Sequence, residues 1–204
     1  MIAIIDYDAG NIKSVEKAFE YLGEDVVLTS DKETILKADG AVLPGVGAFG
    51  EAVKRLSDRG LIDVIKEYVA LNKPFLGICL GYQLMFENSE ESPGVEGLGF
   101  FKGSCIRFDE KNGLKIPQIG WNSLSFTKRS GMFEGLNDNP YVYFVHSYYV
   151  KAGDESIVAA TADYGNVFHA ACEHNNVFGC QFHPEKSSEV GLSILKNFVK
   201  ATKE

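Results

Sequence analysis

The sequence has no basic cluster and no long apolar run. Its 204 residues include 20 Lys or Arg against 28 Asp or Glu, which gives a formal net charge of −8. The longest basic run is the pair Lys128-Arg129, whereas binding a nucleic-acid backbone needs a basic surface. Apolar runs stay below the roughly 18 residues of a membrane span, and the apolar start at 1–5 lacks the basic flank of a secretory signal. We therefore expect a protein that binds neither nucleic acid nor a membrane.

Cysteine is scarce, and no two cysteines form a C-x-x-C pair. The four thiols lie in apolar runs, at Cys79, Cys105, Cys172 and Cys180. Disulfide frameworks and zinc sites typically show closely spaced cysteine pairs. The pattern therefore predicts reduced thiols, no bound metal or cofactor, and a location in the cytoplasm.

Short apolar runs alternate with amphipathic segments in about the first hundred residues. Strands are predicted at 2–5, 26–29, 41–43 and 74–78, and helical segments at 12–22 and up to Leu71, with a break at Arg59-Gly60. Between them, Ser30 and Glu33 have the spacing of a capping box and predict the start of another helix. This alternation predicts a parallel sheet whose strands are joined by helices.

The second half of the sequence has closely spaced apolar runs instead. They lie at 100–108, 118–126, 141–150, 157–162, 166–174 and 177–182, before a final amphipathic helix that contains Leu192 and Phe198. Such spacing favours antiparallel strands. We therefore predict one α/β domain over residues 1–204, with a mostly parallel central sheet flanked by helices and an added antiparallel part.

The segment Gly-Ile-Cys-Leu-Gly at 77–81 has the form of a nucleophile elbow with Cys79 as the nucleophile. It follows a predicted buried strand and precedes a helix. The tight turn between them favours glycine on both sides. A helix N-terminus favours the thiolate, which is the attacking form, and the N–H of Leu80 would point at an oxyanion.

His183 is the histidine best placed to act as the base for this thiol. It ends the apolar run 177–182 and precedes Pro184-Glu185. A residue before proline is extended, and residues two apart in extended chain face the same side. Glu185 is therefore expected to accept a hydrogen bond from His183, as the acid of a triad does. A weaker signal is the glycine-rich loop at 44–47, whose backbone N–H groups can also turn toward an oxyanion.

Two motifs together resemble the class I, or triad, glutamine amidotransferases. They are Gly-Ile-Cys-Leu-Gly-Tyr-Gln at 77–83 and Gln-Phe-His-Pro-Glu-Lys-Ser at 181–187. Segments at 4–11, 43–50, 119–122 and 143–148 are similar to one branch of that family, the glutaminase subunits of imidazole glycerol phosphate synthase. The resemblance extends from about residue 2 to the last helix and implies a flavodoxin-like fold.

This resemblance implies hydrolysis of the side-chain amide of L-glutamine through a γ-glutamyl thioester on Cys79. His183 would protonate the departing ammonia and then activate water, and Glu185 would orient His183. In such relatives the 44–47 strand reorients to complete the oxyanion hole. The further positions that match are Val46, Gly47 and Leu80 for the oxyanion hole and Gly45, Gln83, Ser147 and Tyr148 for the substrate.

The resemblance also implies a partner, because ammonia released into water is protonated and lost as a nucleophile. In the resembled family a separate cyclase subunit with a (β/α)8 barrel receives the ammonia in histidine biosynthesis. Trp121, Tyr143 and Lys186 match its docking surface. The alternatives are Trp121 and Tyr143 packed in the core and Lys186 as a solvated charge. His146 matches a position near glutamine, but a structural role suits its aromatic strand equally well.

Two alternative functions are compatible with the same fold. A paralogous glutaminase that supplies ammonia for amidation of a surface sugar would keep these motifs. A regulatory subunit without catalysis would be expected to lose a triad residue, and this sequence retains Cys79, His183 and Glu185.

Overall fold

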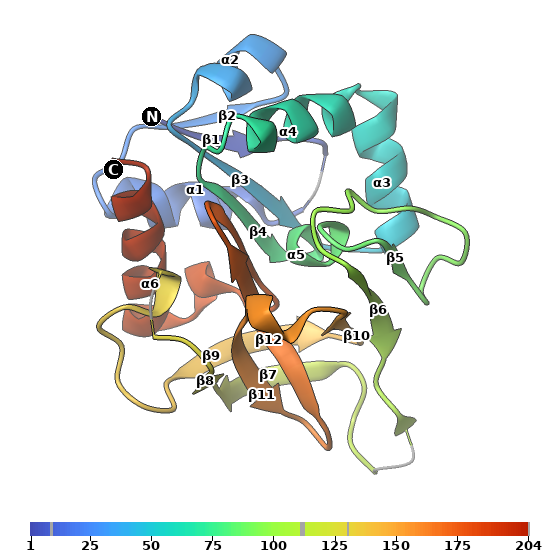
Figure 1. The fold of residues 1–204 in the computed structure, drawn as a ribbon. Coiled ribbons are helices and arrows are strands. Elements are labelled where there is room, and N and C mark those ends of the chain that lie inside the picture. Colours follow the sequence, from blue (N-terminus) through green and yellow to red (C-terminus); the bar gives the residue numbers. More distant parts are fainter. Residues whose placement is uncertain (9, 111–112, 130, 204) are drawn as a thin grey trace.

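Strands and helices alternate along the first half of the chain, as the sequence predicts (Figure 1). The computed structural model describes residues 1–8, 10–110, 113–129 and 131–203, so Ala9 of the 4–11 motif lies outside it. The first elements are β1 (Ile2–Ile5), α1 (Ile12–Tyr21), β2 (Val26–Thr29), α2 (Lys32–Lys37), β3 (Gly40–Gly45), α3 (Phe49–Asp58), α4 (Leu61–Ala70), β4 (Phe75–Cys79) and α5 (Leu80–Leu84). The predicted break separates α3 from α4, where Gly60 adopts a left-handed φ of 67°.

The second half of the chain consists mainly of strands. They are β5 (Asn88–Ser89), β6 (Gly103–Arg107), β7 (Gln118–Ser123), β8 (Ser125–Phe126), β9 (Tyr141–His146), β10 (Tyr148–Ala152), β11 (Val158–Asp163), β12 (Val167–His174) and β13 (Val177–Cys180), followed by α6 (Ser188–Ala201). Among the described residues, each helix is too short or too polar to span a bilayer.

The main sheet joins a parallel part to an antiparallel part through β13. Its order is β2-β1-β3-β4-β13-β12-β10-β6-β5. β13 pairs parallel with β4 and antiparallel with β12. The sequence predicts only the antiparallel pairing of this strand. Because Cys180 is opposite Ile78 in the register, the chain leaving β13 runs directly past Cys79 at the end of β4.

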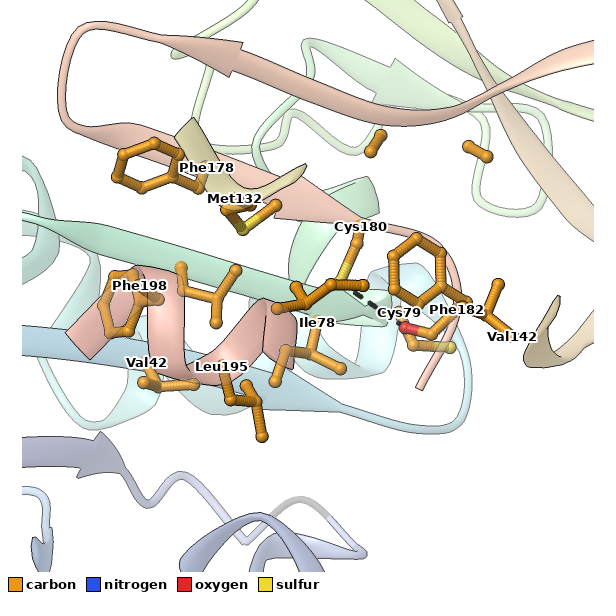
Figure 2. Packing of buried hydrophobic residues seen from close by; sticks show 14 of the residues in the cluster. Val42, Ile78, Cys79, Met132, Val142, Phe178, Cys180, Phe182, Leu195 and Phe198 are labelled. Atoms are coloured by element: carbon orange, nitrogen blue, oxygen red, sulfur yellow. Dashed lines mark hydrogen bonds between the residues drawn. The ribbon is translucent and has the colours of Figure 1, made fainter. Parts of the chain in front are cut away.

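The parallel strands are apolar on both faces, because helices cover both (Figure 1). Alternate residues of one strand enter different core clusters. Val42 packs with residues of α1 and α6, including Phe19 and Phe198, whereas Leu43 packs with residues of α3 and α4. Figure 2 shows Cys79, Cys180 and Phe182 close together within the first cluster. Cys79 therefore packs directly against the hydrophobic core.

The predicted capping box at Ser30 and Glu33 is wrong by one residue. Helix α2 begins at Lys32, which puts Asp31 at the N-cap. The Asp31 carboxylate accepts a hydrogen bond from Thr34 N at 2.8 Å. Thr29 Oγ1 in turn accepts from Asp31 N at 2.9 Å. A carboxylate at the cap satisfies an unpaired helix donor as well as a serine does, and the chain uses it here.

Candidate active site

Cys79 sits in a sharp turn between strand β4 and helix α5, as the elbow motif predicts. Its φ of 54° and ψ of −108° are unusual for a residue with a side chain. The neighbouring glycines are required by sterics. A Cβ at Gly81 would lie 1.8 Å from Leu43 O, and one at Gly77 would lie 2.9 Å from Gly81 O. The collision that glycine avoids at position 81 is therefore with strand β3.

His183 and Glu185 form a buried pair beside this turn. His183 Nδ1 lies 2.7 Å from Glu185 Oε1, and both side chains are almost fully excluded from solvent. His183 is extended, as predicted, but Pro184–Lys186 forms a 3-10 turn. The turn, rather than continued extended chain, brings Glu185 back to the imidazole.

The other ring nitrogen of His183, Nε2, makes no such contact within the part of the chain that the structure describes. Nε2 is buried and has no hydrogen-bond partner among the described residues. Burial alone lowers the pKa of His183, but the interactions with Cys79 and Glu185 outweigh burial and raise that pKa to about 10. The charged form of His183 is therefore favoured beside Cys79, an arrangement that suits a cysteine paired with a histidine base.

Asn11 is a member of this site that sequence reasoning misses. Its Nδ2 donates to Glu185 Oε1 at 2.7 Å, from a residue 174 positions away. Asn11 has a φ of 68° at the start of α1, a conformation that asparagine tolerates better than most residues. The Gly-Asn pair ending the 4–11 motif is the one signal that could have found it.

A cavity of about 280 Å³ opens beside Cys79. Among the residues predicted for the oxyanion hole and the substrate, the lining contains Val46, Gly47, Leu80, Gln83, Ser147 and Tyr148. It also contains Glu91, Pro117, Val145 and His146, of which the sequence motifs point only to His146. A larger hollow of about 850 Å³, between Lys66 and the 87–99 loop, contains none of the predicted site residues. The smaller cavity is therefore the candidate substrate site.

Gly45 lies behind this cavity rather than in its lining. It pairs with Cys79 across β3 and β4, and a Cβ there would lie 2.5 Å from the Tyr7 hydroxyl. That hydroxyl donates to Pro44 O at 2.9 Å. Beyond this fixed point Val46 is 41% exposed and Gly47 has a φ of 103°, so the end of the glycine-rich loop forms the open wall of the site.

His146 is buried within hydrogen-bond distance of two oxygen atoms. Nδ1 lies 2.8 Å from Tyr148 O, and Nε2 lies 2.9 Å from Gln118 Oε1. Burial lowers its pKa to about 4. A neutral imidazole at pH 7 helps to fix the cavity wall and is a poor source of protons there.

Known proteins share this arrangement of sequence and fold. Residues 3–202 match the family described as glutamine amidotransferase class-I.

The chain belongs to the class I glutamine amidotransferases.

Several relatives of this amidotransferase carry one name, imidazole glycerol phosphate synthase subunit HisH. The protein of that name from Bacillus cereus (strain G9842) is 52% identical, over 97% of this chain and 93% of the relative. The one from Sulfurimonas denitrificans is 48% identical over 98% of each chain. The branch that the sequence motifs resemble is therefore also the branch of these relatives.

Solved structures confirm the predicted fold. One crystal structure of a glutamine amidotransferase has a TM-score of 0.78 at 17% identity and covers all of both chains. Another glutamine amidotransferase, from Thermotoga maritima, has a TM-score of 0.63 at 20% identity, over 99% of this chain and 81% of its own. At such identities the likeness concerns the α/β architecture alone.

An exposed apolar ribbon lies next to the amidotransferase cavity. Strands β7 and β9 pair with each other as a separate antiparallel sheet. Trp121 is 51% exposed and contacts Tyr143 edge to face, with ring centroids 6.1 Å apart. Lys186 Nζ lies 6.0 Å from the centre of the Tyr143 ring. The alternative that Trp121 is packed in the core is wrong, and the three residues predicted for docking share one surface.

Proposed function

We propose that this amidotransferase hydrolyses L-glutamine to L-glutamate and ammonia. The observation that carries the proposal is the opening of a strained cysteine elbow into a small cavity, with a buried His183–Glu185 pair beside it. The cavity volume of about 280 Å³ lies at the lower end of small-molecule sites, which suits a single amino acid.

The substrate is oriented by groups at both ends of the cavity. Glu91 supplies a carboxylate to the lining, which complements the α-ammonium group of glutamine. One of its oxygens is already fixed by Phe49 N at 2.7 Å. Gln83, Ser147 and Tyr148 add polar contacts, so the side-chain amide of the substrate is directed at Cys79.

The reaction proceeds through a thioester. The Cys79 thiolate attacks the amide carbon, and the charge on the carbonyl oxygen is stabilised by backbone N–H groups of Leu80 and of the Val46–Gly47 loop. His183 gives a proton to the departing nitrogen, which leaves as ammonia. It then takes a proton from water as the water attacks the γ-glutamyl thioester. Glu185 holds His183 in position throughout.

We further propose that the ammonia passes to a cyclase subunit in a heterodimer. The partner is a (β/α)8 barrel that docks on Trp121, Tyr143 and Lys186 and forms imidazole glycerol phosphate and aminoimidazole carboxamide ribotide in L-histidine biosynthesis. Relatives named as subunits of imidazole glycerol phosphate synthase support this proposal. The free thiols of the chain fit the cytoplasm, where we place the complex.

The rate of glutamate release tests the proposal directly. The full chain is assayed with glutamine, alone and with the cyclase subunit and its nucleotide ligand. We expect release to rise sharply in the complex and to vanish in Cys79→Ala. Cys172→Ala is the matched control, because this buried thiol lies in β12 against Tyr82 and outside the cavity lining. Unchanged turnover in Cys79→Ala would contradict the triad, and turnover that ignores the cyclase would contradict the heterodimer.

A further inference from the structure

Gln181 is a fully buried polar side chain whose amide faces the nucleophile. It follows β13, with no measurable exposure to solvent. Its Nε2 lies 3.8 Å from Cys79 Sγ, within the range of a hydrogen bond to sulfur. Its Oε1 accepts from Gln83 Nε2 at 3.0 Å. Both polar ends of this amide are therefore used.

The contacts around Gln83 fix which end of Gln181 faces the sulfur. Tyr148 O lies 2.9 Å from the Gln83 amide, and a backbone carbonyl can only accept. The Gln83 atom at that position must be its NH2 group. The same NH2 group then gives its second hydrogen to Gln181, so an oxygen of Gln181 faces Gln83 and the NH2 group of Gln181 faces Cys79.

The backbone places this donor and the catalytic base on the same side. Gln181 N donates to Ala170 O at 2.8 Å, which continues the pairing with β12. The chain bends at Gln181 and Phe182, directly after β13. The side chains of Gln181 and His183 both interact with Cys79, while Phe182 enters the core beside Cys79 (Figure 2). One short segment thus delivers two groups to the sulfur.

We propose that Gln181 is a further catalytic residue, whose amide donates a hydrogen bond to Cys79 Sγ and stabilises the thiolate. This inference rests on the proposed glutaminase reaction. A hydrogen bond to a charged acceptor is stronger than one to a neutral acceptor, and more so in a site shielded from water. The bond is therefore strongest before the sulfur attacks and again as the sulfur leaves the thioester, and weakest in the neutral thioester between these steps.

Alkylation of Cys79 by iodoacetamide tests the bond without requiring catalysis. Two variants of the full chain remove the donor. Gln181→Met removes both polar groups, and Gln181→Glu keeps the shape and the acceptor for Gln83. Modification is followed at pH 7 by mass spectrometry of the peptide that contains Cys79. The other thiols, Cys105, Cys172 and Cys180, are fully buried and burial raises their pKa values, so they react slowly.

We expect alkylation to slow about tenfold in Gln181→Met, the effect of losing one charge-assisted hydrogen bond. We expect it to slow further in Gln181→Glu, which puts an oxygen against the sulfur. In the complex with the cyclase subunit, kcat falls by a similar factor while KM stays within about twofold, because Gln181 is absent from the described cavity lining. Asn197→Leu is the matched control, since within the described part of the chain the Asn197 amide donates to the carbonyls of Met132 and Glu134 alone.

Wild-type alkylation rates and kcat in both variants would overturn the role of Gln181, even if their melting temperatures fall. If Gln181→Met does not fold, the isosteric Gln181→Glu decides alone. A wild-type complex that releases no glutamate would instead overturn the proposed function, and the alkylation rates would still decide whether Gln181 binds the sulfur.

Discussion

Folding shifts the pKa values of two buried histidines of this site in opposite directions. For His183, burial opposes the charged form, but Cys79 and Glu185 outweigh burial and raise the pKa from 6.5 to about 10. Its stabilising contribution is therefore complete below pH 6.5 and is lost as the pH rises toward 10. For His146, burial lowers the pKa from 6.5 to about 4. Between pH 6.5 and pH 4, His146 is therefore protonated in the unfolded chain but neutral in the folded chain. The free energy of unfolding consequently falls as the pH drops from 6.5 toward 4.

The loss of stability between pH 6.5 and pH 4 can be assigned to His146. We expect the free energy of unfolding of the wild-type chain to fall between pH 6.5 and pH 5 by up to about 1.4 kcal/mol per pH unit from this residue alone. In His146→Gln that contribution disappears and the slope becomes shallower. Urea unfolding at pH 6.5 and at pH 5 measures this change in the free energy of unfolding. His174→Gln, a change at an exposed histidine, should keep the wild-type slope, and an unchanged slope in His146→Gln would refute the assignment.

At the residue scale, the sequence predicts groups that act together in local motifs and misses groups that meet across the fold. Cys79 is predicted by its flanking glycines, and Glu185 by its spacing from His183. Asn11 is not predicted, because its partner is 174 positions away. Gln181 is the first residue of the 181–187 motif, but the pattern does not show that β13 pairs with β4 and brings Gln181 to Cys79.

The nucleophile elbow is the element whose form is fixed most tightly by sterics. Strand β4 ends at Cys79, and helix α5 begins at the next residue. The helix can approach β3 this closely only because Gly81 has no Cβ, since that atom would lie 1.8 Å from Leu43 O. The close approach keeps Cys79 facing the cavity.

Adding one methyl group to the elbow should therefore be costly. We expect Gly81→Ala to lower the free energy of unfolding by about 3 kcal/mol or more, because a backbone carbonyl cannot move aside as a side chain can. Thermal and urea unfolding measure the loss. In the control Gly153→Ala the new Cβ meets its nearest atoms at 3.4 Å, an ordinary contact, and a small effect is expected. Similar losses in both variants would show that the elbow is not specially constrained.

At the element scale, the sequence locates elements better than it pairs them. Apolar periodicity places β1 to β4, α1 and the α3–α4 break within a few residues, because burial of these faces is a local property of the chain. The helix cap moves from Ser30 to Asp31 because Thr29 fixes the Asp31 backbone. Pairing of β13 with β4 depends on contacts about a hundred residues apart, which no local pattern contains.

At the scale of the whole molecule, the β7–β9 ribbon exposes several large apolar side chains near the cavity. Ile119 and Tyr141 are 58% and 60% exposed and lie on the same side of the ribbon as Trp121. These two residues extend the predicted docking surface. Large aromatic side chains at the centre of an interface contribute most of its affinity, which makes Trp121 the main candidate for a binding hot spot.

Loss of Trp121 should weaken the heterodimer. We expect Trp121→Ala to lower affinity for the cyclase subunit by about 2 kcal/mol or more, roughly thirtyfold in Kd. Isothermal titration calorimetry with the cyclase subunit measures this loss of affinity. The melting temperature of the free chain should change little, because half of this side chain is in water. Val167→Ala, at another exposed apolar residue on β12, should bind as wild type does, and equal affinity of all three proteins would refute the docking surface.

Inward and outward side chains alternate along strand β9 of this ribbon. Val142 and Phe144 of β9 are buried in the core, whereas their neighbours Tyr141 and Tyr143 face outward. Substitutions at the outward positions are expected to alter the proposed docking surface without disturbing the packing of Val142 and Phe144. Neighbouring residues of a single strand therefore meet different physical requirements, because the inward side chains must fill the core and the outward ones need not.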